Sequence, residues 1–282
     1  MPENPKAKER AASTFERLQA LHPDTHCELD HRDPFQLLVA TVLSAQTTDV
    51  LVNQVTPKLF GNWPDAPSLG QAKIPEVAAV LRERLGMYNQ KAKNIVGLAK
   101  KIVTKHGGEV PRTLAELVEL PGVGRKTANV VLGVAFGRPE GVVVDTHVQR
   151  LSQRLGWTSN TTPEKIEKDL CALLPPEDWN LLSLTLIFHG RRICFARKPA
   201  CGACGISEVC PSAFNAEHVG RKPKKKRGAA AIAKVVEAKK TTKKAVKKAA
   251  SKAVPKNAKE EGVVKATKAS VKKRARVKVS AS

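Results

Sequence analysis

The composition of the chain changes abruptly near residue 221, and this change limits how much of it can fold. Residues 221–282 contain 23 of the 49 lysines and arginines, only three acidic residues and no aromatic residue. Such a segment cannot bury enough apolar surface to offset the conformational entropy that is lost on ordering. We therefore expect a disordered basic tail over 221–282. The part of the chain before it, 1–220, is long enough for two small folded lobes.

The high net charge belongs almost entirely to this basic tail. The chain has a formal net charge of +23, of which +20 falls in the segment 221–282 and only +3 in the segment 1–220. Lys240, Lys244 and Lys248 are spaced by four, so a helix there would stack like charges. Phosphates would relieve this repulsion, and we expect the tail to bind nucleic acid nonspecifically. The alternative is a generic solubilising extension.

The segment 1–220 shows the apolar spacing of helices, interrupted by glycine and proline. Asp33-Pro34 is a typical helix start, and Gly107-Gly108 is a typical break. Val142-Val143-Val144 is strand-like but too short to found a sheet. The sequence therefore predicts an all-α fold. The expected helices span residues 7–21, 35–43, 74–85, 90–106, 114–120, 125–136, 146–155, 163–174 and 179–190.

Lys126 occupies an unusual place for a lysine. It follows the run Pro121-Gly122-Val123-Gly124-Arg125, which predicts a tight hairpin between two helices because glycine frees the backbone to turn. The next helix begins at about Arg125, so the helix dipole and Arg125 both disfavour a charged Lys126. A neutral lysine can act as a nucleophile. The alternative is an ordinary surface lysine beside a turn.

Four cysteines, Cys194, Cys201, Cys204 and Cys210, lie close together in the sequence. Disulfides are rare in intracellular proteins, so clustered thiols predict a metal site. Zinc sites more often use two C-x-x-C pairs, whereas a [4Fe–4S] cluster accepts irregular spacing. Spacing alone leaves zinc and iron–sulfur open. Cys27 and Cys171 are isolated and are expected to be small buried residues.

Several segments in this order resemble the endonuclease III family, the iron–sulfur DNA glycosylases with a helix-hairpin-helix. The resemblance extends from about residue 11 to residue 210 and leaves the basic tail outside. The segments that carry it are LSAQTTD at 43–49, YNQKA at 88–92, PGVGRKTAN at 121–129, VDTH at 144–147 and HGR at 189–191, followed by the four cysteines.

The resemblance implies two helical lobes and a [4Fe–4S] cluster. A six-helix barrel over residues 29–139 would carry the helix-hairpin-helix, and residues 1–28 and 140–220 would form the cluster lobe. DNA would lie across the cleft between the lobes. Cys194, Cys201, Cys204 and Cys210 would bind the cluster, which would hold the adjacent loop in place.

The resemblance also implies catalytic roles for Lys126 and Asp145. Neutral Lys126 would attack the sugar C1′ of a flipped nucleotide, and the resulting Schiff base would allow β-elimination. The Asp145 carboxylate would stabilise positive charge on the sugar. The alternative role for Asp145 is to cap the helix that begins at Thr146.

Further residues are expected to contact DNA. Gln46 would fill the gap left by the flipped nucleotide, and Met87 would be an apolar wedge. A buried core position is the ordinary alternative for Met87, and His147 has an equal claim to a structural role. The remaining expected contacts are Gly122, Val123, Gly124 and Arg125 of the hairpin, with Arg197 and Lys198 of the loop between the first two cluster cysteines.

We therefore expect a bifunctional DNA glycosylase and abasic-site lyase that removes oxidised pyrimidines from duplex DNA. One alternative is an adenine- or thymine-mismatch glycosylase of the same superfamily, whose members generally lack the lysine at position 126. The other is a DNA-compacting protein that acts through the basic tail. No signal peptide or membrane segment is visible. We expect a monomer in the cytoplasm or nucleoid of a bacterium, or in the nucleus of a eukaryote.

Overall fold

The computed structural model describes residues 5–220, which belong to a compact unit that ends at Lys222. Residues 1–4 and the basic tail lie outside the described residues. The all-α prediction is confirmed, because no strand occurs between residues 5 and 220. Within the same residues, none of the helices combines the length and apolarity that a bilayer crossing needs.

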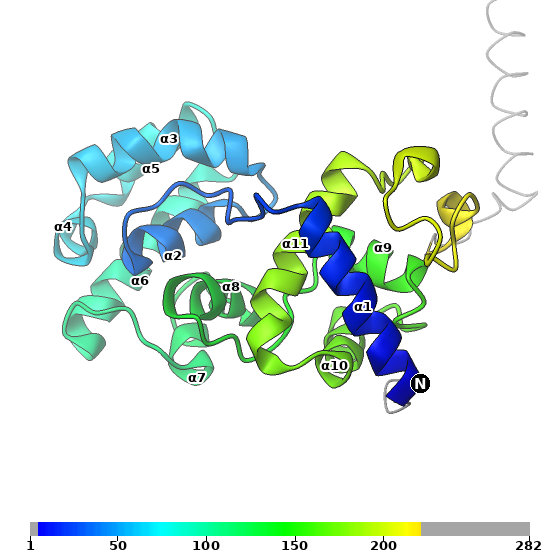
Figure 1. The fold of residues 1–282 in the computed structure, drawn as a ribbon. Coiled ribbons are helices and arrows are strands. Elements are labelled where there is room, and N and C mark those ends of the chain that lie inside the picture. Colours follow the sequence, from blue (N-terminus) through cyan, green and yellow to red (C-terminus); the bar gives the residue numbers. More distant parts are fainter. Residues whose placement is uncertain (1–4, 221–282) are drawn as a thin grey trace, which may run out of the picture. The chain divides into compact units, whose positions relative to one another are not determined.

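The described residues have two hydrophobic cores (Figure 1). The first core lies among seven helices, in which α4 and α5 pack on α6 while α3 and α8 pack on α2. Leu37, Leu38, Leu81, Ile95 and Leu98 are fully buried in it. The helices are α2 (Pro34–Leu43), α3 (Asp49–Asn62), α4 (Ala66–Gln71), α5 (Ile74–Arg82), α6 (Tyr88–His106), α7 (Leu114–Val118) and α8 (Arg125–Phe136).

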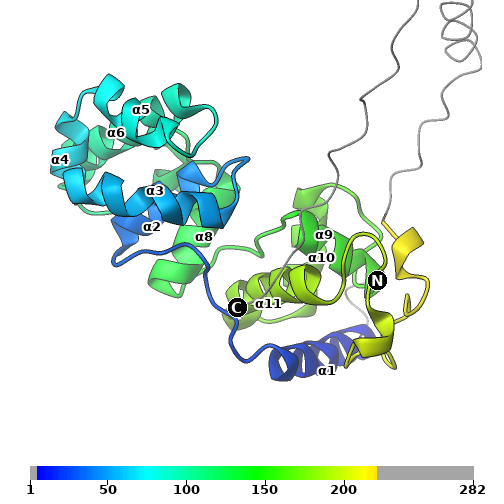
Figure 2. The same cartoon turned by 90° about the horizontal axis from the view of Figure 1, so that it is seen from above.

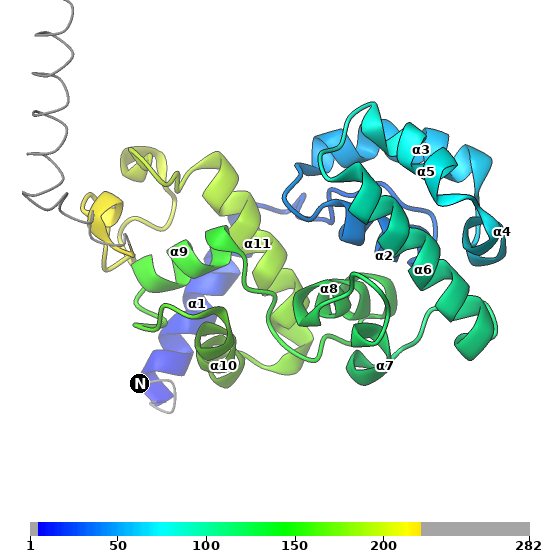
Figure 3. The same ribbon diagram turned by 180° about the vertical axis from the view of Figure 1, so that it is seen from behind.

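The second core joins the start of the described chain to its last part. Leu18 of α1 (Pro5–Leu21) shares this core with Leu151, Leu182 and Leu186. Helix α1 is nearest the viewer in Figure 1 and lies behind α9 in Figure 3. The other elements are α9 (Thr146–Arg154), α10 (Pro163–Leu173), α11 (Trp179–Arg192) and the 3₁₀ turns η1 (Pro176–Asp178), η2 (Cys201–Ala203) and η3 (Ala216–His218).

Helices α8 and α11 pack against each other and connect the two groups of helices, which Figure 2 shows from above. An ion pair between Arg125 and Glu167 joins α8 to α10, and one between Arg191 and Asp49 joins α11 to α3. The predicted domain limits, 29–139 and 1–28 with 140–220, stay a prediction.

Two helices differ from expectation. Helices α3 and α4 were not predicted, although Val52, Val55 and Leu59 of α3 are buried at helical spacing. As expected, Val142–Val144 founds no sheet, and it pairs with no strand among the described residues. Instead, the Val143 N–H donates to the Ser183 hydroxyl of α11 at 3.0 Å. The start at Asp33-Pro34 is as expected, because the Asp33 carboxylate accepts the Gln36 N–H at 2.8 Å.

Candidate active site and metal centre

A pocket of about 330 Å³ lies where both groups of helices contribute side chains. Its walls come from the segment before α2, the α2–α3 connection, the start of α8, the residues before α9 and one face of α11. Lys126 and Asp145 both line it, with Gln46 and Asp49. The two residues expected to be catalytic are therefore brought to one cavity from two different helix starts, those of α8 and α9.

Lys126 is exposed and lies in the first turn of α8. Gly124 is the N-cap and provides no side-chain hydrogen bond, so the first N–H groups of α8 lack a capping group. Arg125 points its guanidinium to Glu167, with 2.9 Å between Nη2 and Oε1. The positive end of the helix dipole therefore lies beside Lys126, while the neighbouring arginine is paired with an acid.

Asp145 is the N-cap of α9 and lines the same pocket. Its Oδ1 atom accepts the N–H groups of His147 and Val148, both at 2.7 Å. Its Oδ2 atom makes no hydrogen bond within residues 5–220. The capping role considered for Asp145 is therefore present, and it leaves one carboxylate oxygen available in the pocket.

Asp49 and Arg191 belong to the pocket but were not predicted as site residues. Arg191 pairs with Asp49, with 3.0 Å between Nη2 and Oδ2, and also with Glu28. Burial raises the pKa of the Asp49 carboxyl, the charge of Lys126 lowers it, and that of Asp145 raises it. Asp49 therefore lies close enough to Lys126 and Asp145 for the charges of both to influence it. Asp49 and Arg191 both lie in segments that carry the family resemblance, and this resemblance is the sequence signal that could have identified them as site residues.

The hairpin before α8 turns at Gly122, whose φ is +79°. A Cβ there would lie 2.8 Å from Nδ2 of Asn94, so glycine is needed for both conformation and space. Val123 is buried, and its N–H donates to the Leu120 carbonyl at 3.1 Å. Within the described residues, the Gly122 and Gly124 N–H groups make no backbone hydrogen bond, unlike that of Val123.

Three of the expected DNA contacts adopt a left-handed backbone that non-glycine residues seldom use. Gln46, Met87 and Lys198 have φ values of 55°, 53° and 50°. The core alternative for Met87 is excluded, because 51% of this residue is exposed. Such conformations persist where the surroundings hold them, and they gather at functional sites.

The other two expected contacts differ in their surroundings. His147 is half-buried and packs on Gly190, and its Nδ1 accepts from Nη2 of Arg150 at 3.2 Å. Burial lowers the pKa of His147, which favours a neutral ring. Arg197 is exposed beside Lys198. The structural role considered for His147 therefore has direct contacts in its favour.

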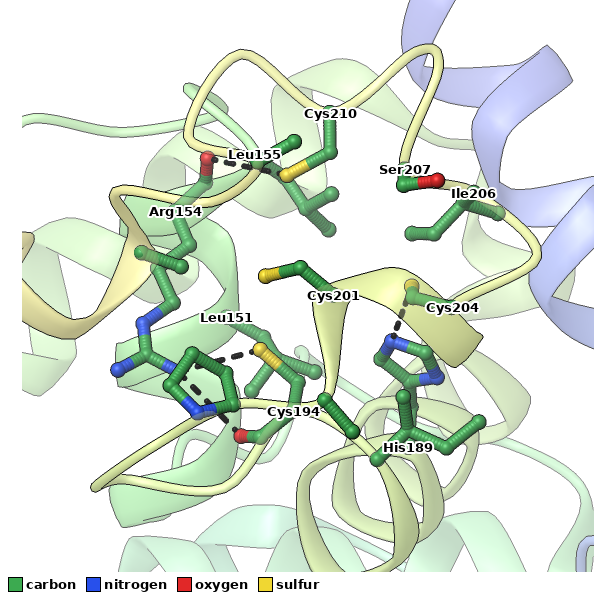
Figure 4. Close-up of a pocket in the computed structure, with 15 residues that line it drawn as sticks. Leu151, Arg154, Leu155, His189, Cys194, Cys201, Cys204, Ile206, Ser207 and Cys210 are labelled. Carbon is green, nitrogen blue, oxygen red and sulfur yellow. Dashed lines mark hydrogen bonds between the residues drawn. The ribbon is translucent and has the colours of Figure 1, made fainter.

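The four clustered cysteines face one cavity (Figure 4). Leu151, Leu155 and Ile206 also line it. Among residues 5–220, no three metal-binding side chains converge on a single ion position, so the geometry of the cysteines alone assigns no metal.

The surroundings of Arg154 indicate that an anionic group belongs in this cavity. Only 1% of it is exposed, and among residues 5–220 no carboxylate lies within ion-pair distance. Its Nη1 donates to the Cys194 sulfur at 3.2 Å and to the Phe195 carbonyl at 2.8 Å, while its Nε has no partner. A buried cation without an anion is strongly unfavourable. Four thiolates around an iron–sulfur core supply the missing negative charge.

His189 of α11 approaches the same cavity from the other side. Its Nε2 lies 3.6 Å from the Cys204 sulfur, and its Nδ1 lies 2.9 Å from Nε2 of the buried His22. Burial raises the pKa of the Cys204 and Cys210 thiols, and the neighbouring cysteines raise it further. Four closely spaced thiolates therefore need a cationic core to balance their charge.

Comparisons with known proteins agree with this interpretation of the pocket and the cysteine cavity. The model of HhH-GPD superfamily base excision DNA repair proteins matches residues 39–176. The model of the iron-sulfur binding domain of endonuclease III matches residues 194–210, from the first clustered cysteine to the last. The [4Fe–4S] cluster is therefore the cofactor of this chain, and the choice between zinc and iron–sulfur is decided.

Individual relatives extend the likeness beyond these two regions. Endonuclease III of Synechocystis sp. is 52% identical over 206 residues, which cover 73% of this chain and 94% of the relative. The solved structure of a trapped endonuclease III–DNA covalent intermediate matches with a TM-score of 0.69 and 42% identity, covering 74% of this chain and 97% of that one. A thermostable thymine-DNA glycosylase matches with a TM-score of 0.66 and 27% identity, covering 75% and 100%.

The family resemblance predicted from the sequence is confirmed, since this likeness spans nearly the whole length of the relatives and includes both the helical fold and the cluster region. The chain belongs to the endonuclease III family, within the HhH-GPD superfamily of base excision DNA repair proteins.

Proposed function

We propose that this DNA glycosylase and abasic-site lyase removes oxidised pyrimidines from duplex DNA with Lys126 as its nucleophile. The observation that carries the proposal is that Lys126 and Asp145 line one pocket at the start of a helix without a capping side chain. A pocket of about 330 Å³ is of the size that takes a small ligand such as a single base. The enzyme would work as a monomer, because one chain supplies every proposed group.

The proposed reaction begins with a nucleotide that has left the base stack. The neutral Lys126 amine forms a bond to C1′ while the bond from C1′ to the damaged base breaks. The departing base takes up a proton, and the sugar ring opens to give a Schiff base between Lys126 and C1′. Loss of a C2′ proton then expels the 3′ phosphate, and water releases the lysine. Lysine is required because a hydroxyl group cannot form the imine.

Asp145 would act at two stages of this sequence. Its available Oδ2 atom faces the positive charge that develops at the sugar as the base departs. It would also accept protons as the amine becomes nucleophilic. The cap on α9 holds the carboxylate at a fixed position, so it would need no rearrangement during the reaction.

The DNA would be held by contacts on both sides of the pocket. The Gly122 and Gly124 amides, with the open end of α8, would bind a phosphate. Arg125 would contribute charge beside them, and Gln46 and Met87 would enter the duplex at the lesion. Arg197 and Lys198 would contact a further phosphate. Val123 would support the turn from the core, and His147 would support the residues around Asp145.

The cluster would be bound by Cys194, Cys201, Cys204 and Cys210 and would supply a structural tether. These residues enclose the loop 195–200 that carries Arg197 and Lys198, and Arg154 binds the carbonyls of the same loop. With four cysteine ligands, no coordination position remains for substrate.

Reductive trapping tests the proposal directly. A duplex that contains thymine glycol is incubated with the protein and borohydride, which converts a Schiff base into a stable covalent complex. We expect the wild-type protein to form this complex and Lys126→Ala to form none, while Lys93→Ala, an exposed lysine of α6, forms it normally. Trapping that persists in Lys126→Ala would refute the role of Lys126. Preference for an adenine or thymine mismatch over thymine glycol would refute the substrate.

A further inference from the structure

Lys91 is the one lysine of residues 5–220 that is buried, with 4% of its surface exposed. Its Nζ donates to the Thr47 hydroxyl at 2.5 Å, and no carboxylate of the described residues lies within ion-pair distance. Burial lowers the pKa of Lys91, as expected for an ammonium without an acidic partner. Such a residue lowers stability, so its presence needs another reason.

The hydroxyl that receives Lys91 belongs to the turn that carries Gln46. The Thr47 N–H closes the turn on the Ser44 carbonyl at 3.0 Å, and the Thr47 hydroxyl lies 3.4 Å from the Ala45 carbonyl. Gln46 stands inside this turn with its φ of 55°. Hydrogen bonds therefore connect Lys91 to Thr47 and Thr47 to Ala45, the two residues on either side of the left-handed Gln46.

The backbone of Lys91 is hydrogen-bonded to Met87, the second left-handed residue. Its N–H donates to the Met87 carbonyl at 3.0 Å, which is the first helical hydrogen bond of α6. Met87 is the N-cap of α6 and has no side-chain cap to hold it. Lys91 thus contacts Met87 directly and reaches the turn that carries Gln46 through Thr47.

Helix α6 also reaches the hairpin. Met87, Lys91 and Asn94 are separated by four and three positions, so they lie on one face of the helix. Asn94 is the residue that leaves no room for a side chain at Gly122. One face of α6 therefore contacts the turn that carries Gln46 and the hairpin that is proposed to bind phosphate. The same face includes Met87 at the start of the helix.

We propose that Lys91 is a positioning residue that fixes the Gln46 turn against the start of α6, so that Gln46 and Met87 enter the duplex as one rigid unit. This inference rests on the proposed function, because it assumes that both residues replace an extruded nucleotide. Two strained residues on separate segments keep their geometry only when the surroundings hold them. The buried ammonium provides this constraint at a cost in stability.

Extrusion without cleavage gives the direct test. A duplex carries a tetrahydrofuran abasic analogue beside 2-aminopurine, whose fluorescence rises when its neighbour leaves the stack. The variants are Lys91→Met and Thr47→Val, with the exposed Lys93→Met of the same helix as matched control. We expect the first two to reduce the fluorescence rise and to slow single-turnover removal of thymine glycol by about 10- to 100-fold. Lys93→Met should behave as wild type.

Two further measurements distinguish positioning from a general structural role. Lys91→Met should melt at the wild-type temperature or above it, because it removes a buried charge. The double variant with Thr47→Val should be no slower than the slower single variant, because both changes break one contact. If Lys91→Met fails to fold, Thr47→Val alone decides the matter.

Extrusion and rates within about twofold of wild type in both variants, or fully additive losses, would overturn the role of Lys91. A wild-type protein that extrudes the analogue but leaves thymine glycol intact refutes the proposed substrate, and the fluorescence data then still decide the role of Lys91. A wild-type protein that removes thymine glycol but gives no fluorescence rise refutes the role of Lys91 and leaves the proposed substrate standing.

Discussion

At the scale of single residues, Asp145 uses its two carboxylate oxygens for different purposes. Oδ1 accepts two backbone N–H groups and begins α9, whereas Oδ2 makes no hydrogen bond within residues 5–220. The structural role and the proposed chemical role therefore do not compete. They can be separated by substitutions that keep the cap and remove the charge.

We expect Asp145→Asn to keep the stability of the protein and lose activity. Asparagine caps helices about as well as aspartate, so the free energy of unfolding should change by less than about 0.5 kcal/mol. The single-turnover rate of base removal should fall by about 10² to 10⁴-fold, because the negative charge at the sugar is lost. Asp145→Ala should lose similar activity and in addition about 1 kcal/mol of stability. Chemical denaturation and single-turnover kinetics measure the two effects.

An Asp145→Asn variant with wild-type rates would show that capping is the whole function of Asp145. A variant that loses stability as strongly as Asp145→Ala would show that the amide does not replace the cap.

The glycine hairpin singled out Lys126 and the family resemblance implied the role of Asp145, whereas the side-chain contacts of their neighbours could not be predicted. Lys126 follows a glycine hairpin, and Asp145 precedes a helix. Asp49 and Arg191 pair across 142 positions, and Lys91 reaches Thr47 across 44. Such contacts depend on how helices pack, and no periodicity within one segment reports them. The left-handed backbone of Gln46 and Met87 is equally a product of the surrounding contacts.

At the scale of elements, the missed helices show why local propensity was insufficient. Helix α3 contains Pro57 and several β-branched residues, which weaken intrinsic helix formation. Helix α4 has only six residues, begins with an Asp65 capping box and approaches α6 closely at Gly70. Packing and capping stabilise both helices. The valines at 142–144 favour extended backbone, but no partner strand is present among residues 5–220.

The cluster loop is the element whose stability depends most on a cofactor. Arg154 donates to the carbonyls of Cys194, Phe195 and Ala196, so one guanidinium holds three successive backbone positions. Arg150 lies close enough for the charge of Arg154 to lower its pKa, after the larger effect of burial. The buried Arg154 and the half-buried Arg150 both lie beside Cys194, and an anion in the cavity would stabilise their charges.

We expect Arg154→Gln to lose the cluster faster than the wild-type protein. The substitution removes the buried counter-charge and part of the support for the loop. The measurements are iron per protein and the absorbance band near 400 nm, followed over time with a chelator present. The control is Arg192→Gln, which removes an exposed arginine paired with Asp24.

Arg154→Lys separates the two contributions of Arg154. It keeps the charge and loses the fork of donors, so we expect a loss rate between those of the wild type and Arg154→Gln. Equal retention of iron in Arg154→Gln and the wild-type protein would contradict the counter-ion role.

At the scale of the whole molecule, the charge and the proposed chemistry occupy different parts of the chain. The segment 1–220 carries a net charge of +3 and contains every proposed site residue, whereas the segment 221–282 carries +20. Nonspecific attraction to DNA and recognition of a damaged base are therefore expected to depend on separate segments. The alternative of a DNA-compacting protein assigns the main activity to the tail.

Deleting residues 221–282 should weaken binding to undamaged DNA and reduce its dependence on salt. Each phosphate contact releases counterions, so if about ten tail charges meet phosphates, the log–log slope should become shallower by roughly nine units. Binding is measured by fluorescence anisotropy at several salt concentrations. Borohydride trapping at low salt should be retained, because Lys126 and Asp145 lie before the deletion. An unchanged slope would contradict the role of the tail, and lost trapping would show that base removal requires the tail as well.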